Sequence, residues 1–430
     1  MTTLVLGAGL SGRAAVRLLQ HKGKPFRLFD ESGQSTLGSE TVAGPEWDDS
    51  ILEGITRVVA SPGFPEHSRP IRAALEASIP VISEPELAFP YLLMPVIAIT
   101  GTNGKTTVTQ LVHDMFVASG HRSIAAGNIG LPLSDIIEDE YDVAVVELSS
   151  FQLRFVDQFR PVISVLINVA SDHLDWHADR DAYVAAKARI VENQGEYDRV
   201  IFNRDDPDVV NIAKGSRARL TVVSVTSGLA EYGVRDGALW FGSFGVPIRE
   251  LNVSDNAFLS DLLLAGAAAL AGGASPAAVE SVARAFTPSQ HRRMVIRVSN
   301  GVTYVDDSKA TNPHAAMAAI ATYRSVLLIA GGQAKGLDLS PMVAAEQVKH
   351  VFALGEAADE LVAAGPGKVT KVSGFDDALE RALGVAVAGD TVLLAPGCAS
   401  FDMFHSYGAR GDDFVRAVHT ALDLKQERLS

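Results

Sequence analysis

The sequence contains a single cysteine, Cys398, among its 430 residues. An intrachain disulfide is therefore impossible, and such sparse cysteine is typical of proteins of the reducing cytosol. Net positive charge is also lacking, because 37 Lys and Arg stand against 51 Asp and Glu. The resulting formal net charge of −14 argues against a general binder of nucleic acids or anionic membranes. The longest apolar stretch, residues 262–274, is too short to span a bilayer, and no signal peptide is visible at the start. We therefore expect a cytoplasmic protein without a nucleic-acid or membrane partner.

The composition is that of a globular protein, with 47% hydrophobic and 20% charged residues. The chain is long enough for about three domains. Short apolar runs alternate with Ala- and Leu-rich helical stretches, which is typical of parallel α/β architecture with both sheet faces covered. Two prolines within residues 89–95 indicate a linker, and a second boundary falls near residues 287–289. We predict an α/β fold of three nucleotide-binding-like domains, covering residues 1–90, 91–287 and 288–430.

A glycine-rich turn near the start follows an apolar strand and opens a helix, with the sequence Gly7-Ala8-Gly9-Leu10-Ser11-Gly12. Such glycines let the N-terminus of a helix approach a diphosphate. Asp30 ends the next predicted strand, where a carboxylate can accept a hydrogen bond from a ribose hydroxyl. Taken alone, the motif indicates NAD, FAD or another diphosphate ligand, or only a tight strand–helix turn. These alternatives stay open at this point.

A sharper signal lies between an apolar strand at residues 96–100 and a helix, with the sequence Gly101-Thr102-Asn103-Gly104-Lys105-Thr106-Thr107. Backbone amides of such a loop wrap phosphate oxygens, Lys105 can neutralise terminal phosphates, and the Thr106 hydroxyl can reach Mg²⁺. Ile99 stands where the longer form of this loop has its first glycine, so the loop is a shortened variant. We predict that ATP binds here.

Polar residues follow the next two predicted strands. Glu147 ends an apolar strand, where a carboxylate is either a Mg²⁺ ligand or a helix N-cap. Residues 168–177, Asn-Val-Ala-Ser-Asp-His-Leu-Asp-Trp-His, carry too many polar side chains for packing alone. Their spacing is not that of a zinc site, and oxygen-rich ligands suit Mg²⁺ better. Lys187, taken alone, is expected to be an exposed lysine on a helix.

The last third of the chain places polar loops after several predicted strands. The loops are His291-Arg292-Arg293, residues 306–313, residues 331–336 and residues 396–402. Each one alone is explained as a loop, but together they bring cations and hydroxyls to the strand ends of one domain. That combination indicates a site for an anionic substrate and a polyphosphate.

With these motifs in order, the whole chain resembles the Mur ligase family of cell-wall amide ligases. The resemblance rests on the shortened loop at residues 101–106, Glu-Leu-Ser-Ser-Phe-Gln-Leu from Glu147, the stretch 168–177 and the helix containing Tyr183 and Lys187. The sequence Asp307-Ser308-Lys309-Ala310-Thr311-Asn312 is similar to the branch that adds D-glutamate to UDP-N-acetylmuramoyl-L-alanine. The resemblance implies a Rossmann-like UDP-binding first domain, a P-loop-type ATPase as the central domain and a Rossmann-like C-terminal domain that binds the amino acid.

The activity implied by the resemblance is amide formation driven by ATP. The substrate carboxylate becomes an acyl phosphate, an incoming amine attacks it, and phosphate leaves, while the protein orients the reactants and stabilises negative charge. The implied catalytic residues are Lys105, Glu147, His173 and Lys187. The implied Mg²⁺ ligands are Thr106, Glu147, His173 and Lys187, the last as a CO₂-derived carbamate.

The resemblance also implies three sets of binding residues. The ATP set is the loop Gly101, Thr102, Asn103, Gly104, Lys105, Thr106 and Thr107 together with Arg292, Asp307 and Lys309. The UDP-substrate set is Leu10, Ser11, Asp30, Gly63 and Asn128. The D-glutamate set is Thr311, Lys335, Ser400 and Tyr407. The diphosphate of the first glycine turn would then belong to the substrate, and a monomer with small-molecule partners is expected.

Two departures from the family pattern bear on nucleotide binding. Phe258 and Asp261 stand where the family has two asparagines, and Gln333 stands where an aspartate is common. Competing hypotheses are another amino-acid ligase of the family, a nicotinamide- or flavin-dependent oxidoreductase, and a P-loop switch whose nucleotide state controls a partner.

Overall fold

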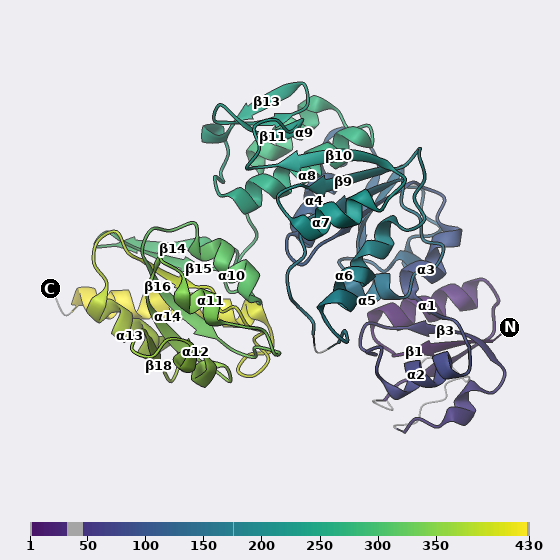
Figure 1. Ribbon diagram of the computed structural model, residues 1–430, viewed down its shortest axis with the longest axis horizontal. Coiled ribbons are helices and arrows are strands. Elements are labelled where there is room, and N and C mark those ends of the chain that lie inside the picture. Colours follow the sequence, from purple (N-terminus) through teal and green to yellow (C-terminus); the bar gives the residue numbers. More distant parts are fainter. Residues whose placement is uncertain (1, 32–45, 175, 428–430) are drawn as a thin grey trace. The chain divides into compact units, whose positions relative to one another are not determined.

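The computed structural model describes residues 2–31, 46–174 and 176–427 (Figure 1). The chain forms two compact units, each described here by itself. The first contains Met1–Val169 and Trp176–Phe286, and the second contains Ala170–Asp175 and Thr287–Ser430. The finer division into three domains stays a prediction.

Four parallel strands form the first sheet, in the order β2-β1-β3-β4. Its elements are β1 (Thr2–Leu6), α1 (Leu10–His21), β2 (Phe26–Phe29), η1 (Asp49–Leu52), β3 (Ile55–Ala60), α2 (Arg69–Glu76), β4 (Val81–Ser83), α3 (Glu84–Ala88) and η2 (Phe89–Tyr91). Successive strand residues point to opposite faces. Val5 joins the core cluster that contains Val16 of α1, whereas Leu4 joins the one that contains Ile71 of α2. Both faces are covered, as the apolar runs predicted.

Nine strands form the second sheet, in the order β13-β12-β11-β10-β9-β8-β5-β7-β6. Its strands are β5 (Val96–Thr100), β6 (Ser123–Gly127), β7 (Val143–Glu147), β8 (Ile163–Leu166), β9 (Arg199–Asn203), β10 (Arg219–Ser224), β11 (Tyr232–Arg235), β12 (Ala238–Phe241) and β13 (Phe244–Pro247). The helices of this part are α4 (Lys105–Ala118), η3 (Leu133–Asp135), α5 (Ser150–Arg154), α6 (Arg180–Ala188), η4 (Arg189–Val191), α7 (Pro207–Lys214), η5 (Ile248–Glu250), α8 (Asn256–Ala271) and α9 (Pro276–Ala285). Because β5 lies between β7 and β8 and is parallel to both, the loops that follow these three strands meet at one edge of the sheet.

One end of the second sheet is antiparallel, so the prediction of parallel architecture is wrong there. β12 pairs antiparallel with β11 and with β13. The turn between β11 and β12 is Asp236-Gly237, with φ of 49° and 70°. An Asp-Gly pair is favoured in two-residue hairpin turns because both positions need positive φ.

The second unit contains a six-stranded sheet in the order β14-β15-β19-β16-β17-β18. Its elements are β14 (Met294–Ser299), β15 (Val302–Asp306), α10 (Pro313–Ile320), β16 (Val326–Gly331), α11 (Ser340–Ala344), β17 (Val348–Leu354), α12 (Ala358–Ala364), β18 (Val369–Lys371), α13 (Phe375–Val385), β19 (Thr391–Leu394) and α14 (Tyr407–Glu427). β14 is antiparallel to β15 and was not predicted; the two strands are joined by Asn300-Gly301, with φ of 50° and 76°.

Alternation along the strands covers both faces of this sheet as well. Leu328 belongs to the cluster formed with α10, α11 and α12, and Leu327 to the cluster formed with α13 and α14. Figure 1 shows these two helical layers on the sheet. In the described part of the chain, no helix combines the length and the apolar character needed to cross a membrane.

Candidate active site

The predicted nucleotide loop connects β5 to α4, and two of its positions require glycine. Gly104 has φ of +87°, and a Cβ on it would lie 2.6 Å from Asp261 Oδ1. A Cβ on Gly101 would lie 2.9 Å from Ile167 Cβ. The loop is therefore packed closely against α8 and the end of β8, which only residues without a side chain permit.

Asn168, two residues beyond β8, holds the amides of this loop. Its side-chain oxygen accepts hydrogen bonds from the backbone N–H of Thr102 at 3.0 Å and of Asn103 at 2.9 Å. Its Nδ2 donates to the Asn103 carbonyl at 3.2 Å. The amides already converge on an oxygen, which is the arrangement that phosphate oxygens require. Sequence reasoning placed Asn168 in a polar stretch and gave it no role.

Two lysines donate to carbonyl oxygens of the same loop. Lys105 Nζ lies 3.0 Å from both the Gly101 and the Thr102 oxygen, and Lys187 Nζ lies 2.8 Å from the Gly101 oxygen. Lys187 is 1% exposed, and its Nζ lies 4.6 Å from the centre of the Tyr183 ring. The expectation of an exposed helix lysine is therefore wrong, because α6 turns this side chain onto the loop. Both ammonium groups bring positive charge to the predicted phosphate site.

Glu147, the last residue of β7, is 1% exposed. Its Oε1 accepts a hydrogen bond from Asn128 Nδ2 at 2.8 Å, whereas its Oε2 is buried and has no hydrogen-bond partner among the described residues. The N-cap of α5 is Ser149, so Glu147 does not serve as that cap. A buried carboxylate oxygen without a donor is costly unless a cation balances it, and Mg²⁺ prefers such oxygens. The Oε2 of Glu147 is therefore a suitable ligand for a magnesium ion.

The other predicted metal ligands are less tightly defined. Thr106 and Thr107 lie in the first turn of α4. Among the described residues, no three His, Cys, Asp or Glu side chains gather as a metal site. A cation near Glu147 would thus need oxygens from groups such as the Thr106 hydroxyl and a carbamate on Lys187. These ligand roles stay predictions.

His173 lies in the segment Ala170–Asp175, which belongs to the second unit, whereas Glu147 belongs to the first. It has φ of +54°, and its backbone N–H donates to Asp172 Oδ1 at 2.9 Å. Asp175 of the same stretch lies outside the described residues. The role of His173 as a metal ligand stays a prediction.

Both departures on α8 lie in the protein interior. Phe258 is 3% exposed and packs edge-on against Phe286, with ring centres 5.8 Å apart. Asp261 is buried, with its Oδ1 against Gly104. A carboxylate therefore stands beside the nucleotide loop, and an apolar ring lies in the core, at the two positions where amides were expected.

The first glycine turn forms a separate candidate site at the carboxyl ends of β1, β2 and β3. A Cβ on Gly12 would lie 1.8 Å from the Gly7 oxygen, so α1 begins directly on the turn. Asp30 Oδ2 accepts a hydrogen bond from the Ala8 N–H at 2.6 Å. A Cβ on Gly7 would lie 3.1 Å from Ser61, which brings the loop after β3 against the turn. The predicted substrate contacts carried by these loops are Leu10, Ser11, Asp30 and Gly63.

In the second unit, the residues predicted to face the nucleotide lie near one another. Asp307 follows β15, and burial raises the pKa of its carboxyl to about 6. The positive charges of Arg293 and Arg292 act in the other direction and lower it. The Arg293 N–H donates to Asp307 Oδ1 at 3.2 Å. Lys309 Nζ lies 5.4 Å from the centre of the Tyr407 ring, which links the predicted nucleotide and amino-acid sets.

The predicted amino-acid contacts lie on loops that are bonded together. Gln333 and Ala399 exchange two backbone hydrogen bonds, of 2.9 Å and 3.0 Å. This pairing joins the loop of Lys335 to that of Ser400, which is 3% exposed. Thr311 is partly buried in the loop before α10.

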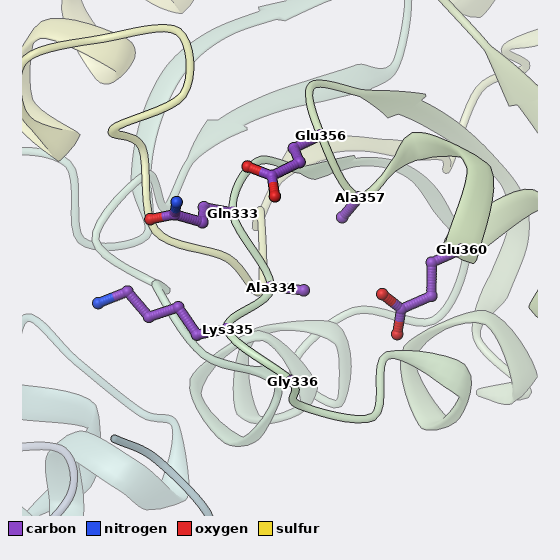
Figure 2. Close-up of a pocket in the computed structure, with 7 residues that line it drawn as sticks. All are labelled: Gln333, Ala334, Lys335, Gly336, Glu356, Ala357 and Glu360. Carbon is purple, nitrogen blue, oxygen red and sulfur yellow. The ribbon is translucent and has the colours of Figure 1, made fainter. Parts of the chain in front are cut away.

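A cavity of about 410 Å³ lies beside Lys335, lined by Gln333, Ala334, Lys335, Gly336, Glu356, Ala357 and Glu360. Figure 2 shows the carboxylates of Glu356 and Glu360 on one side and the Lys335 ammonium extending away from Glu360. Two carboxylates at one cavity repel an acidic ligand. An acidic amino acid is therefore better matched to the outward side of Lys335 than to this cavity.

Sequence reasoning missed Arg410, a 2%-exposed guanidinium on α14. It donates hydrogen bonds to the loops of Ser308 and Ala399. A signal was present, since Arg410 lies one helical turn before Phe414 on the buried stripe of the helix.

Comparison with known proteins identifies the family. The model of the Mur ligase middle domain matches residues 99–267, and that of the Mur ligase glutamate ligase domain matches residues 291–398. The UDP-N-acetylmuramoylalanine--D-glutamate ligase of Frankia casuarinae is 41% identical, over 97% of this chain and 94% of that protein. The chain belongs to the Mur ligase family. Its relative of the same name from Geobacillus kaustophilus is 37% identical over 97% of both chains.

Solved structures of the Mur ligase family share the fold. The MurF ligase of Thermotoga maritima in complex with ADP has a TM-score of 0.63 and 16% identity, over 98% of this chain and 95% of that one. Membership confirms the resemblance found in the sequence and identifies the chain as a ligase. It thereby disfavours the oxidoreductase and switch hypotheses.

Proposed function

We propose that this Mur ligase joins D-glutamate to UDP-N-acetylmuramoyl-L-alanine in the cytoplasm, in an ATP-dependent step of peptidoglycan precursor synthesis. The observation that carries the proposal is near-full-length similarity to proteins of one name. Eight relatives called UDP-N-acetylmuramoylalanine--D-glutamate ligase are 36–41% identical to this chain, and the matches cover at least 94% of each.

In this proposal the nucleotide loop holds the phosphates of ATP. The amides of Thr102 and Asn103, which converge on one oxygen acceptor, would bind phosphate oxygens. Lys105 would leave its loop carbonyls and pair with the terminal phosphates. Arg292, Asp307 and Lys309 would complete the nucleotide site from the second unit.

Mg²⁺ would be held by Glu147 Oε2 and the Thr106 hydroxyl, with His173 and a carbamate on Lys187 as further ligands. When bound, the ion neutralises phosphate charge and orients the triphosphate. The Oε2 of Glu147 supports this assignment, because it is buried and no donor reaches it within the part of the chain that the structure describes.

The reaction has two steps, phosphorylation of the substrate carboxylate and attack of the amine on the product. The substrate carboxylate attacks the terminal phosphorus and ADP leaves, so that the acid becomes an acyl phosphate. The amine of D-glutamate then attacks the carbonyl carbon, loses a proton and expels phosphate. The chain contributes orientation and fixed positive charge.

The two other substrates are assigned to separate loops. Leu10, Ser11, Asp30 and Gly63 would bind the UDP moiety, with Asn128 near the sugar-linked end. Thr311, Lys335, Ser400 and Tyr407 would bind D-glutamate, with the Lys335 ammonium on a carboxylate. The outward direction of Lys335 in Figure 2 supports this use of its charge.

The test is a phosphate-release assay that crosses nucleotide-sugar substrates with D- and L-amino acids. We expect release of ADP and phosphate only when UDP-N-acetylmuramoyl-L-alanine and D-glutamate are both present. Equal turnover with L-glutamate, or with a longer UDP-linked peptide and a diamino acid, would assign the chain to another branch of the family.

A further inference from the structure

Arg410 is a charged side chain in the core of the second unit. It lies in the first turn of α14, on the stripe that buries Phe414, Ala417 and Val418, and it is only 2% exposed. Burial lowers the pKa of its guanidinium to about 10, which leaves it charged at neutral pH. A buried charge persists only where hydrogen-bond acceptors replace water, so its partners are informative.

Those partners are oxygens of two loops that were assigned to ligand binding. Arg410 Nε donates to Ser308 Oγ at 3.0 Å and Nη2 to the Ser308 carbonyl at 2.9 Å. Nη1 donates to the carbonyls of Cys398 at 3.0 Å and Ala399 at 3.3 Å. Within the described residues no carboxylate forms a direct ion pair with Arg410. The two terminal nitrogens of the planar guanidinium thus connect the backbone at Ser308 to the backbone at Cys398 and Ala399.

Each of these contacts lies next to a predicted ligand contact. Ser308 stands between Asp307 and Lys309, and its Oγ also donates to the Tyr407 carbonyl at 2.8 Å. Ala399 immediately precedes Ser400.

A third loop is coupled through Ala399. Its backbone pairs with Gln333, two residues before Lys335. A Cβ on Gly332 would lie 2.3 Å from the Ala399 oxygen and 3.2 Å from Arg410 Nη1, so this loop needs glycine to approach the guanidinium. The loops that carry Thr311 and Ser400 are therefore bonded to Arg410 directly, and the loop of Lys335 is connected to it through Ala399.

We propose that Arg410 is a positioning residue that fixes the spacing of the D-glutamate-binding loops relative to the nucleotide-facing loop. The role rests on the proposed function and needs no contact between Arg410 and any substrate. Lysine supplies the charge but neither the five N–H donors nor the flat geometry that spans both loops.

The experiment is steady-state kinetics of the full-length chain carrying Arg410→Lys, with Arg416→Lys as the matched control. Arg416 lies on the same helix, is 56% exposed and pairs with Asp413. We expect Arg410→Lys to raise the KM for D-glutamate about tenfold or more and to lower kcat by a similar factor. The KM for UDP-N-acetylmuramoyl-L-alanine should change by less than about twofold, because its proposed contacts lie in the first unit. Arg416→Lys should match the wild type.

A merely structural role gives a different pattern. Loss of folded protein lowers kcat through the active fraction and leaves every KM unchanged, and that result would overturn the proposal. Ser308→Ala provides a second variant in case Arg410→Lys does not fold. It deletes the Oγ acceptor of Arg410 and the donor to Tyr407, and it should raise the KM for D-glutamate about threefold to tenfold.

The wild type separates this inference from the proposed function. If the wild type forms no product from D-glutamate, the proposed function fails and the assignment of these loops fails with it. If the wild type is active and both variants have its KM for D-glutamate, only the positioning role of Arg410 is refuted.

Discussion

Replacing Glu84 by glutamine is expected to stabilise the first unit at neutral and alkaline pH. Glu84 begins α3 and is 2% exposed. Its Oε1 accepts a hydrogen bond from the Ser134 N–H at 2.6 Å, whereas its Oε2 is buried and has no partner in residues 2–31, 46–174 and 176–427. Burial raises the pKa of its carboxyl to about 7, despite the hydrogen bond from Ser134. Above that pH the protein contains a buried carboxylate with too few donors.

The magnitude follows from the difference between the pKa values of the folded and unfolded chain. The folded value of about 7 exceeds the ordinary 4.5, so the folded state holds the proton more tightly. The stabilising contribution of this proton is complete below pH 4.5 and is lost as the pH rises to 7. The loss amounts to about 3 kcal/mol, at about 1.4 kcal/mol for each unit of pKa. Glutamine carries no titrating proton and does not incur this loss.

The assay is urea unfolding followed by tryptophan fluorescence, because Trp47, Trp176 and Trp240 all lie in the first unit. Between about pH 5 and pH 8, the free energy of unfolding of Glu84→Gln relative to the wild type should rise by about 2 to 3 kcal/mol.

Glu86→Gln is the matched control. The Glu86 carboxylate accepts N–H groups of Asp157, Gln158 and Phe159, and glutamine cannot accept all three. This variant should be destabilised at both pH values. Parallel pH profiles of the wild type and Glu84→Gln would refute the reasoning.

Three further predictions concern the site and the single thiol. Lys105→Ala should reduce ligation by about a thousandfold or more with a folded chain by circular dichroism, because the phosphates lose their fixed charge; substantial activity would remove Lys105 from the site. Lys187→Ala should be inactive and be rescued largely by small carboxylates if a carbamate is its working form, whereas full activity without them would exclude that role. Cys398 is buried and burial raises the pKa of its thiol to about 12, so thiol reagents at neutral pH should label it only in denaturant; rapid labelling of the native chain would contradict its burial.

Features that depend on neighbouring residues in the chain could be predicted from the sequence. The loop of Gly101 and Lys105 is local, since a strand, glycines and a helix start fix it together. The hairpin turns at Asp236-Gly237 and Asn300-Gly301 carry an equally local signal, because such pairs favour the positive φ of two-residue turns. This signal indicates antiparallel pairing, whereas we expected parallel architecture at β11 and β12 and no strand at β14.

Features that depend on distant segments could not be predicted in the same way. Lys187 is buried because α6 meets a loop 86 positions away in the sequence. Burial raises the pKa of the Glu84 carboxyl, and the N–H that this carboxyl accepts comes from Ser134 of η3, 50 positions away in the sequence. Arg410 could be predicted only in part. The periodicity of α14 indicates that it is buried but does not reveal which loops it joins.

The hydrogen bonds of Asn168 have a consequence for nucleotide exchange. A phosphate that binds here would have to displace Asn168, because the amides of Thr102 and Asn103 already donate to its side-chain oxygen. Swapping one acceptor for another yields little net free energy. Attraction would then come chiefly from the Lys105 ammonium, and it grows with the charge of the ligand. If ATP binds here as proposed, the loop would hold ADP less tightly than ATP, because ADP lacks the terminal phosphate, and ADP would dissociate readily before the next cycle.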